Sequence, residues 1–163
     1  MCNNGNFEEF ISGEVHKGFY KNGNPATALS KILYSDFFVE PEGDFPYDSA
    51  RELLYGSCDS FALALKKLLN YSPYIINETT GRGFHAFCQI YKEKKWYFVD
   101  ARGVTTSFSE FTGGISRFVE GEFIIRPVGD DDIMNWKSYN EYSDDGLKFA
   151  EAFIEKYKEY YLI

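Results

Sequence analysis

Apolar side chains recur at helical spacing along the chain, and these segments predict amphipathic helices. The most regular pattern follows the polar residues 143–145, with its apolar positions at Leu147, Ala150, Ile154, Tyr157 and Tyr161. A second helix is expected over about Cys58–Leu69, with an apolar stripe at Phe61, Ala62, Leu65, Leu68 and Leu69. Because Lys66 and Lys67 fall off this stripe, we expect a central helix that buries one face.

Residue types that start and stop helices predict further elements toward the N-terminus. The pair Asn24–Pro25 suits a cap and a first helical position, and predicts a helix with Leu29, Ile32 and Leu33 on one face. Residues 39–47 contain two prolines and a glycine, which are typical of a loop. Ser49–Glu52 has capping-box spacing, and Gly56 is placed to end this short helix. Ser57 is then expected to cap the helix that begins at Cys58.

Aromatic and β-branched runs bounded by turn residues predict strands. Tyr74–Ile76 is a short candidate, and Gly121–Pro127 is another, which its proline ends. Between them, Phe84–Tyr91 and Trp96–Asp100 are expected to form an antiparallel hairpin through the charged loop Lys92–Lys95. Together these helices and strands indicate an α+β fold, in which the helix from Cys58 packs on an antiparallel β-sheet and further helices flank this core.

Length and charge limit the classes of function. With 163 residues, 44% of them hydrophobic, we expect a single domain over residues 1–163 with a substantial core. The 25 acidic and 17 basic residues give a formal net charge of −8. This charge argues against binding to nucleic acid and to an anionic membrane surface, because both carry negative charge themselves. A peptide or protein substrate fits the charge better, and the pattern leaves the oligomeric state open.

Apolar runs and cysteines bear on the cellular compartment. No apolar run approaches the roughly 20 residues that span a bilayer, and residues 1–6 are polar, so we expect a soluble protein without a signal peptide. Cys2, Cys58 and Cys88 form neither an even disulfide framework nor a Cys-x-x-Cys pair. We therefore expect a reducing, cytoplasmic location and no metal site, although a protein exported without a leader would show the same pattern.

Three residues that together can activate a sulfur nucleophile follow one another along the chain. Cys58 is expected in the first turn of a helix, where free backbone N–H groups and the helix dipole favour a thiolate. His85 lies near the start of one hairpin strand, and Asp100 ends the other. An imidazole can take the thiol proton, and a carboxylate can orient the imidazole. The candidate catalytic residues are therefore Cys58, His85 and Asp100.

Strand parity tests whether the histidine and the aspartate can meet, because side chains alternate between the faces of a sheet. A four-residue loop at Lys92–Lys95 puts His85 and Asp100 on one face, diagonal to each other. A two-residue loop at Lys92–Glu93 puts them on one face, directly opposite each other. By the same parity Cys88 points to the opposite face from His85 and is expected in the core.

The three motifs resemble the core of the transglutaminase-like family, within the wider papain-like group of thiol enzymes. The matching segments are Gly56–Ala62 around the cysteine, His85–Phe87, and Trp96–Asp100. They cover residues of about 50–102, and the flanking 1–49 and 103–163 are expected to elaborate the same domain. The family commonly follows the aspartate with a proline, whereas this chain has Ala101–Gly103.

The resemblance implies a thiol enzyme that acts on peptide or side-chain amide bonds through a thioester, without a cofactor. Cys58 would attack the carbonyl carbon, His85 would move the proton, and Asp100 would hold the imidazole tautomer. Water as acceptor gives a protease or a deamidase, and an amine gives a protein-glutamine acyl transferase. The backbone N–H of Cys58 is the first choice for the oxyanion hole, with Tyr55 and residues 39–47 as possible sources of a second donor.

Other interpretations of the same residues stay open. The chain would also fit a catalytically inactive transglutaminase-like module that binds a protein in its cleft. Gln89 shares the face of His85 and is a weak candidate for substrate contact. His16 has no metal-ligand spacing around it and is expected on the surface or in a loop. The acidic run 130–132 lacks the pattern of a calcium loop and is expected to start a helix.

Overall fold

The computed structural model describes residues 16–17, 50–54, 56–79, 84–113, 115, 121–138 and 144–163. Within them the chain has an α+β fold with a six-stranded antiparallel sheet in the order β1-β5-β4-β3-β2-β6. The strands are β1 (His16–Lys17), β2 (Pro73–Glu78), β3 (Phe84–Lys92), β4 (Lys95–Asp100), β5 (Gly103–Thr105) and β6 (Phe123–Pro127). The helices are η2 (Ala50–Leu53), α2 (Cys58–Leu69), α3 (Phe108–Gly113), α4 (Asp130–Lys137), α5 (Asp144–Lys156) and η3 (Lys158–Tyr160). The predicted α+β class is confirmed.

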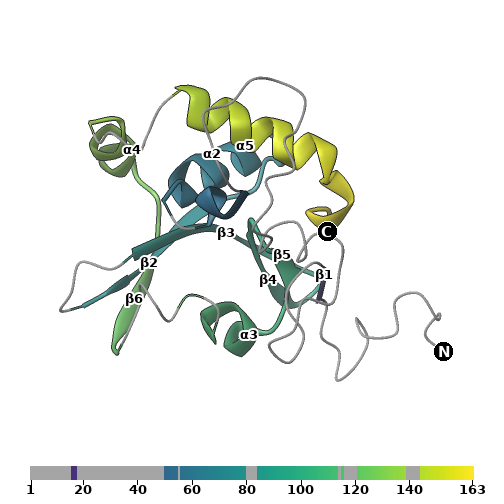
Figure 1. Ribbon diagram of the computed structural model, residues 1–163. Coiled ribbons are helices and arrows are strands. Elements are labelled where there is room, and N and C mark those ends of the chain that lie inside the picture. The colour runs from purple at the N-terminus through teal and green to yellow at the C-terminus, as the bar shows by residue number, and fades with distance from the viewer. Residues whose placement is uncertain are drawn as a thin grey trace.

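The sheet carries helices on both faces (Figure 1). Helices α2 and α5 cover one face, and α3 lies against the other. Alternate strand residues separate into two apolar clusters that match these layers. Ala86 and Val99 belong to the cluster with α2 and α5, whereas Phe87 and Phe98 belong to the cluster with Phe111 of α3. The parity of a strand residue therefore decides which layer its side chain joins.

Helix α2 has the bounds that its apolar stripe predicts, Cys58–Leu69. Ser57 occupies the N-cap position, but its side chain makes no capping hydrogen bond. Instead, Oδ1 of Asp59 accepts the backbone N–H of Ser60 at 2.7 Å. A carboxylate inside the first turn thus satisfies one of the donors that the helix start leaves free.

The β3–β4 hairpin has a two-residue turn, Glu93–Lys94, in which both residues have positive φ, 51° and 65°. Tyr91 pairs with Trp96, which is the register expected from the longer of the two predicted loops, and the ladder extends one pair further. This register puts His85 and Asp100 on one face, two positions from direct opposition. The diagonal arrangement is confirmed, and the directly opposite arrangement is wrong.

Several other elements lie where the sequence pattern predicts them. Strand β2 contains the apolar run predicted around Ile75, β6 ends at Pro127, and α4 begins with the acidic run at Asp130. Helix α5 ends at Lys156, earlier than its periodicity suggests, and the chain tightens into η3. Tyr161 is fully buried after that turn, although it lies beyond the helix.

The region before α2 is described only in part. The short helix predicted at residues 49–52 is the 3₁₀ turn η2, and the N–H of Ser57 donates to the carbonyl of Glu52 at 2.7 Å. His16 lies in strand β1, so a loop position is wrong, and the alternative of a surface position stays a prediction. The helix predicted from Asn24 and the loop 39–47 lie outside the described residues.

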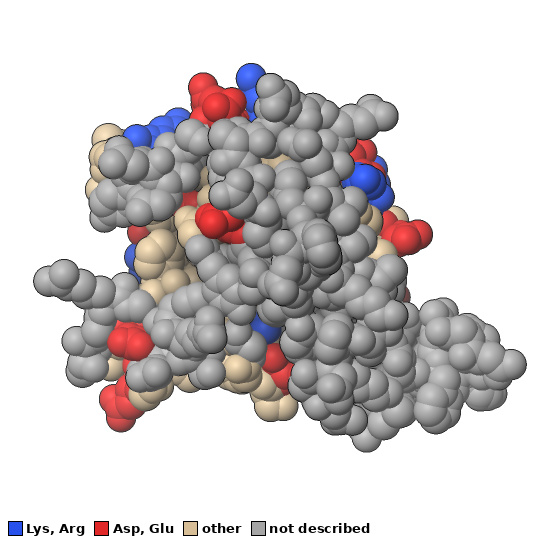
Figure 2. All heavy atoms as spheres, in the orientation of Figure 1, with Lys and Arg blue, Asp and Glu red and all other residues tan. Residues whose placement is uncertain are grey.

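Most charged side chains of the described residues lie on the surface of these layers, whereas Asp59, Asp100 and Arg102 are buried. Lys67 of α2 pairs with Glu151 of α5 at 2.7 Å, and both acidic and basic groups of the described residues are visible on the face in Figure 2. No helix in the described ranges has the length and apolar character that crossing a membrane requires.

Candidate active site

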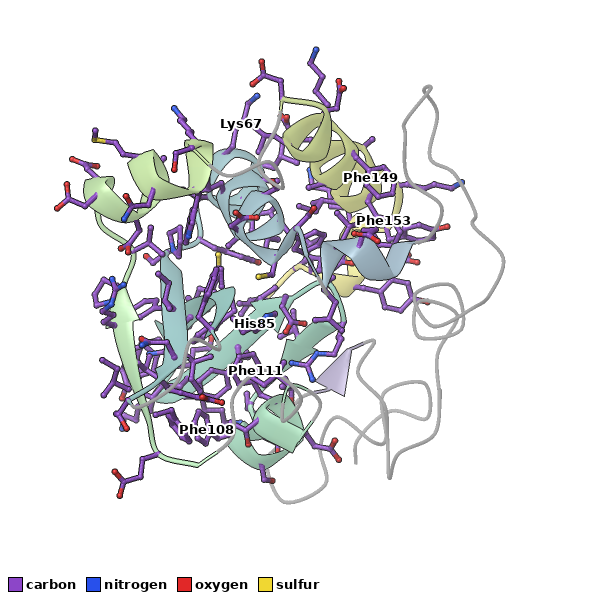
Figure 3. All side chains as sticks on the ribbon, turned by 60° about the vertical axis from the view of Figure 1, so that its left-hand side comes forward. Lys67, His85, Phe108, Phe111, Phe149 and Phe153 are labelled. Atoms are coloured by element: carbon purple, nitrogen blue, oxygen red, sulfur yellow. The ribbon has the colours of Figure 1, made fainter. Side chains whose placement is uncertain are left out.

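His85 and Asp100 form a buried hydrogen-bonded pair. Nε2 of His85 lies 2.9 Å from Oδ2 of Asp100, and the two residues are 0% and 2% exposed. The pair follows from the hairpin register, because both side chains leave the same face of neighbouring strands. Phe87 and Phe111 contact the imidazole, with ring centroids 6.3 and 6.0 Å away. Figure 3 shows His85 and Phe111 close to each other. These contacts fix the imidazole on the α3 face of the sheet.

Cys58 lies at a fork between β3 and β4. The pairing of these strands ends at Cys88 and Val99, whereas β3 continues back toward Phe84. The first residue of α2 meets β3 at this fork, where Sγ of Cys58 accepts the backbone N–H of Ala86 at 3.4 Å. The start of α2 is therefore hydrogen-bonded to the sheet at the residue next to His85.

The direction of the backbone N–H groups explains why this donor meets the sulfur. Gln89 donates its N–H to the carbonyl of Ser72, on the β2 side of β3. Because successive N–H groups of a strand point to opposite edges, the N–H of Ala86 points to the β4 side. The β3–β4 ladder has already ended there, so the thiol takes the place of a strand carbonyl.

The sulfur and the imidazole approach this fork from different layers. Cys58 belongs to the cluster with α2 and Ala86, whereas the ring of His85 contacts Phe87 and Phe111 on the α3 side. A thiol–imidazole contact therefore has to form across the fork. The structure brings His85 and Asp100 together and places Cys58 against the neighbouring backbone. Direct contact between Cys58 and His85 stays a prediction.

Burial decides the protonation of the thiol and the imidazole. It raises the pKa of Cys58 to about 12, although the hydrogen bond from the N–H of Ala86 lowers this pKa. The negative charges of Asp59 and Asp100 add to the rise. Burial also lowers the pKa of His85, and the bond to Asp100 offsets this only in part. The helix start was expected to favour a thiolate, but loss of solvation outweighs it. Both groups are therefore neutral at pH 7 in the folded protein.

Asp100 stays ionised although it is buried. Burial alone would raise its pKa, but the charge of Arg102 and the hydrogen bonds from His85 and Arg102 hold the pKa far below its usual range. Oδ1 accepts the backbone N–H of Arg102 at 2.9 Å and its Nε at 3.1 Å, and Oδ2 accepts Nη2 at 2.7 Å. The sequence pattern marks Arg102 only as part of a departure from the family motif. The sequence feature that could indicate its role is its position two residues after Asp100, on the turn that follows β4.

The C-terminal residues support the same turn. The hydroxyl of Tyr161 donates to the carbonyl of Ala101 at 2.8 Å, between Asp100 and Arg102. The Tyr161 ring makes an edge contact with Phe61 of α2, with centroids 5.4 Å apart. The turn that carries Arg102 is therefore fixed against the layer that carries Cys58.

The remaining candidates take other places. Cys88 is fully buried on the α2 face, as predicted, and its thiol donates to the carbonyl of Ala62 at 3.4 Å. Gln89 is half-buried on the face of His85. Tyr55 is outside the described residues. In the described part of the chain, no group of three His, Cys, Asp or Glu residues is arranged to hold a metal ion.

Comparison of the chain with protein-family models, with curated proteins and with solved structures finds no match. A function for this chain is therefore inferred from the chemistry of Cys58, His85 and Asp100 and from the motifs around them.

Proposed function

We propose that this chain is a thiol enzyme with a transglutaminase-like core, which cleaves or transfers acyl groups from peptide or side-chain amides. The observation that supports it most is the buried 2.9 Å hydrogen bond between His85 and Asp100, beside a cysteine at a helix start. A buried imidazole oriented by an ionised carboxylate is typical of sites that activate a nucleophile. The helix on an antiparallel sheet agrees with the core of that family.

In the proposed reaction Cys58 attacks an amide carbonyl while His85 takes the thiol proton at Nδ1. A carbon–sulfur bond forms, and the carbonyl π electrons move onto oxygen. The tetrahedral intermediate collapses to a thioester, and the imidazolium gives its proton to the departing amine. Water or a second amine then attacks the thioester with His85 again as base, which releases the acyl product and restores the thiol.

A neutral Cys58 thiol and a neutral His85 imidazole suit this scheme. The proton then moves to the imidazole during the attack, and the free protein holds no thiolate–imidazolium ion pair. Cys58 is 8% exposed and His85 is 0% exposed. A substrate carbonyl therefore reaches the sulfur only after the groups that cover it move aside. The reaction also needs a reduced thiol, and both described cysteines, Cys58 and Cys88, are free. We accordingly propose a reducing, cytoplasmic setting.

The same burial favours a second candidate function, an inactive module that binds a protein. A thiol with a pKa of about 12 behaves as a small core residue unless the site opens. In this alternative, His85 and Asp100 serve the stability of the sheet, and partner binding does not involve Cys58.

Alkylation of the cysteines separates the two candidates. Iodoacetamide, or a peptide chloromethyl ketone that mimics an amide substrate and loses chloride when the thioether forms, is added from about pH 5 to pH 9, and the labelled cysteine is located by peptide mass spectrometry. The enzyme predicts faster labelling of Cys58 than of Cys2 or Cys88, with the preference lost in His85→Ala. His16→Ala is the matched control, because it removes the other histidine of the chain. Slow labelling that is equal at the three cysteines and indifferent to His85→Ala contradicts the enzyme and supports the binding module.

A further inference from the structure

The guanidinium of Arg102 links the candidate acid to a second layer of the protein. Besides its bonds to Asp100, Nη2 of Arg102 donates to the carbonyl of Phe111 at 3.0 Å. The guanidinium also lies over the Phe111 ring, 5.3 Å from the centroid. Arg102 is 3% exposed, so this arrangement is made inside the protein. Asp100 is thus held from the turn and from α3 at once, and its oxygens have little freedom to rotate.

The shared oxygen determines which imidazole nitrogen carries the proton. Oδ2 of Asp100 lies 2.9 Å from Nε2 of His85 and 2.7 Å from Nη2 of Arg102. An ionised carboxylate only accepts hydrogen bonds, so Nε2 must be the protonated nitrogen. Nδ1 is then the basic nitrogen of the neutral imidazole. The nitrogen that the proposed reaction uses as base is therefore selected by the orientation of Asp100.

The positive charge of Arg102 also limits what Asp100 does to His85. The carboxylate alone would favour a charged imidazolium, but Arg102 neutralises much of that field. Among the described residues, the other titratable groups that interact with Asp100 include Cys58 of α2, Cys88 of β3 and Tyr161, and Asp59 of α2 acts on Cys58. From α3 the facing side chain is Phe111, which is uncharged. Arg102 is the cation that these contacts place against the carboxylate.

We propose that Arg102 is a positioning residue of this site, which orients Asp100 toward Nε2 of His85 and keeps the imidazole neutral as a base. The proposal rests on the proposed function in one respect, that the base serves Cys58. Its geometric part, the effect of Arg102 on the imidazole, holds or fails independently of catalysis.

The first test reads the imidazole directly in the free protein. Nitrogen NMR in a His16→Gln background leaves His85 as the only histidine, and gives its tautomer and its pKa. We expect Arg102→Gln to lower the fraction protonated at Nε2 and to raise the pKa of His85. Arg126→Gln is the matched control, since Arg126 makes a similar fork with Asp132 at 2.7 and 2.8 Å on the exposed side of the fold. That variant is expected to leave both readings unchanged.

The second test measures the rate of Cys58 labelling by the peptide chloromethyl ketone against pH. In Arg102→Gln we expect a loss of about a hundredfold and a limb on the acid side that moves to higher pH. Arg102→Lys keeps the charge without the planar fork, so it should restore the pH profile and only part of the rate. If Arg102→Gln does not fold, Arg102→Lys carries the test, and a wild-type rate in that variant refutes the proposal.

The outcomes keep the two proposals apart. A wild-type tautomer and pH profile in folded Arg102→Gln means that Arg102 only stabilises the fold, and the positioning role is then wrong. An altered tautomer together with no preference for Cys58 in any variant supports the geometric role of Arg102 and contradicts the enzyme.

Discussion

The protonation of His85 makes a prediction about stability in acid. The imidazole is fully buried, and burial lowers its pKa, so the native protein holds it neutral where an exposed histidine is charged. Below the unfolded pKa of about 6.5, the unfolded chain binds a proton that the native state does not. The free energy of unfolding therefore falls as the pH falls. His85→Gln removes this dependence, and the glutamine amide still has a donor for Asp100.

The size of the effect follows from proton linkage. Each pH unit below the unfolded pKa costs at most about 1.4 kcal/mol for one proton. Between about pH 7 and pH 5 the loss comes to about 2 kcal/mol when the native imidazole stays neutral throughout, since most titration of the unfolded histidine occurs in this window. Asp100, whose pKa is held low, adds its own loss as the pH falls through the usual range of an aspartate pKa toward its lowered value.

Urea denaturation measures this dependence, with the fluorescence of buried Trp136 as the signal. Wild type, His85→Gln and the control His16→Gln are compared at about pH 7, 6 and 5. We expect wild type and His16→Gln to share the loss, and His85→Gln to show a loss that is smaller by up to about 2 kcal/mol over the range. An identical pH dependence in wild type and His85→Gln would refute the neutral buried imidazole, and with it the proposed base.

Further predictions concern the site and the hairpin. Asp100→Asn should slow the labelling of Cys58 by about a thousandfold, which labelling kinetics measure. It should also lower the free energy of unfolding by about 3 kcal/mol in urea denaturation, because it leaves Arg102 buried without its counter-charge. Phe111→Ala should cost about 3–5 kcal/mol of unfolding free energy in the same denaturation, because it empties the centre of the aromatic cluster under the sheet. Replacing Glu93–Lys94 by Asn-Gly should raise the thermal midpoint and stabilise the fold by about 1 kcal/mol, because both residues have positive φ; an unchanged midpoint contradicts strain in this turn.

The sequence predicts those features that one periodicity encodes. The apolar stripe sets the bounds of α2, and alternation along the strands puts His85 and Asp100 on one face while Cys88 takes the other. The sequence allows two loop lengths and therefore two registers, because Glu93–Lys94 lacks the Asn and Gly that usually mark such a turn. Parity was the same in both cases, so the pair could be predicted although the turn could not.

The hydrophobic pattern of the sequence does not predict features that depend on contacts between several segments. The pKa of Cys58 is raised by burial between layers that come together only in the folded protein. The local position at a helix start predicts the opposite, a lowered pKa. Arg102 gains its role from a turn and from α3, neither of which a single period reveals. Helix α5 stops at Lys156 because the chain tightens there, while Tyr161 keeps the apolar spacing without helical backbone.

The hydrogen bond from Tyr161 to Ala101 has a practical consequence for work on this protein. Its two ends lie 60 residues apart in sequence, and the carbonyl that accepts it belongs to the peptide between the acid and its arginine. Affinity tags, fusions or proteolytic trimming near residue 161 therefore act on the candidate acid at close range. Tyr161→Phe keeps the ring against Phe61 and deletes only the hydroxyl, so it tells whether a change in activity after such cloning comes from the lost bond.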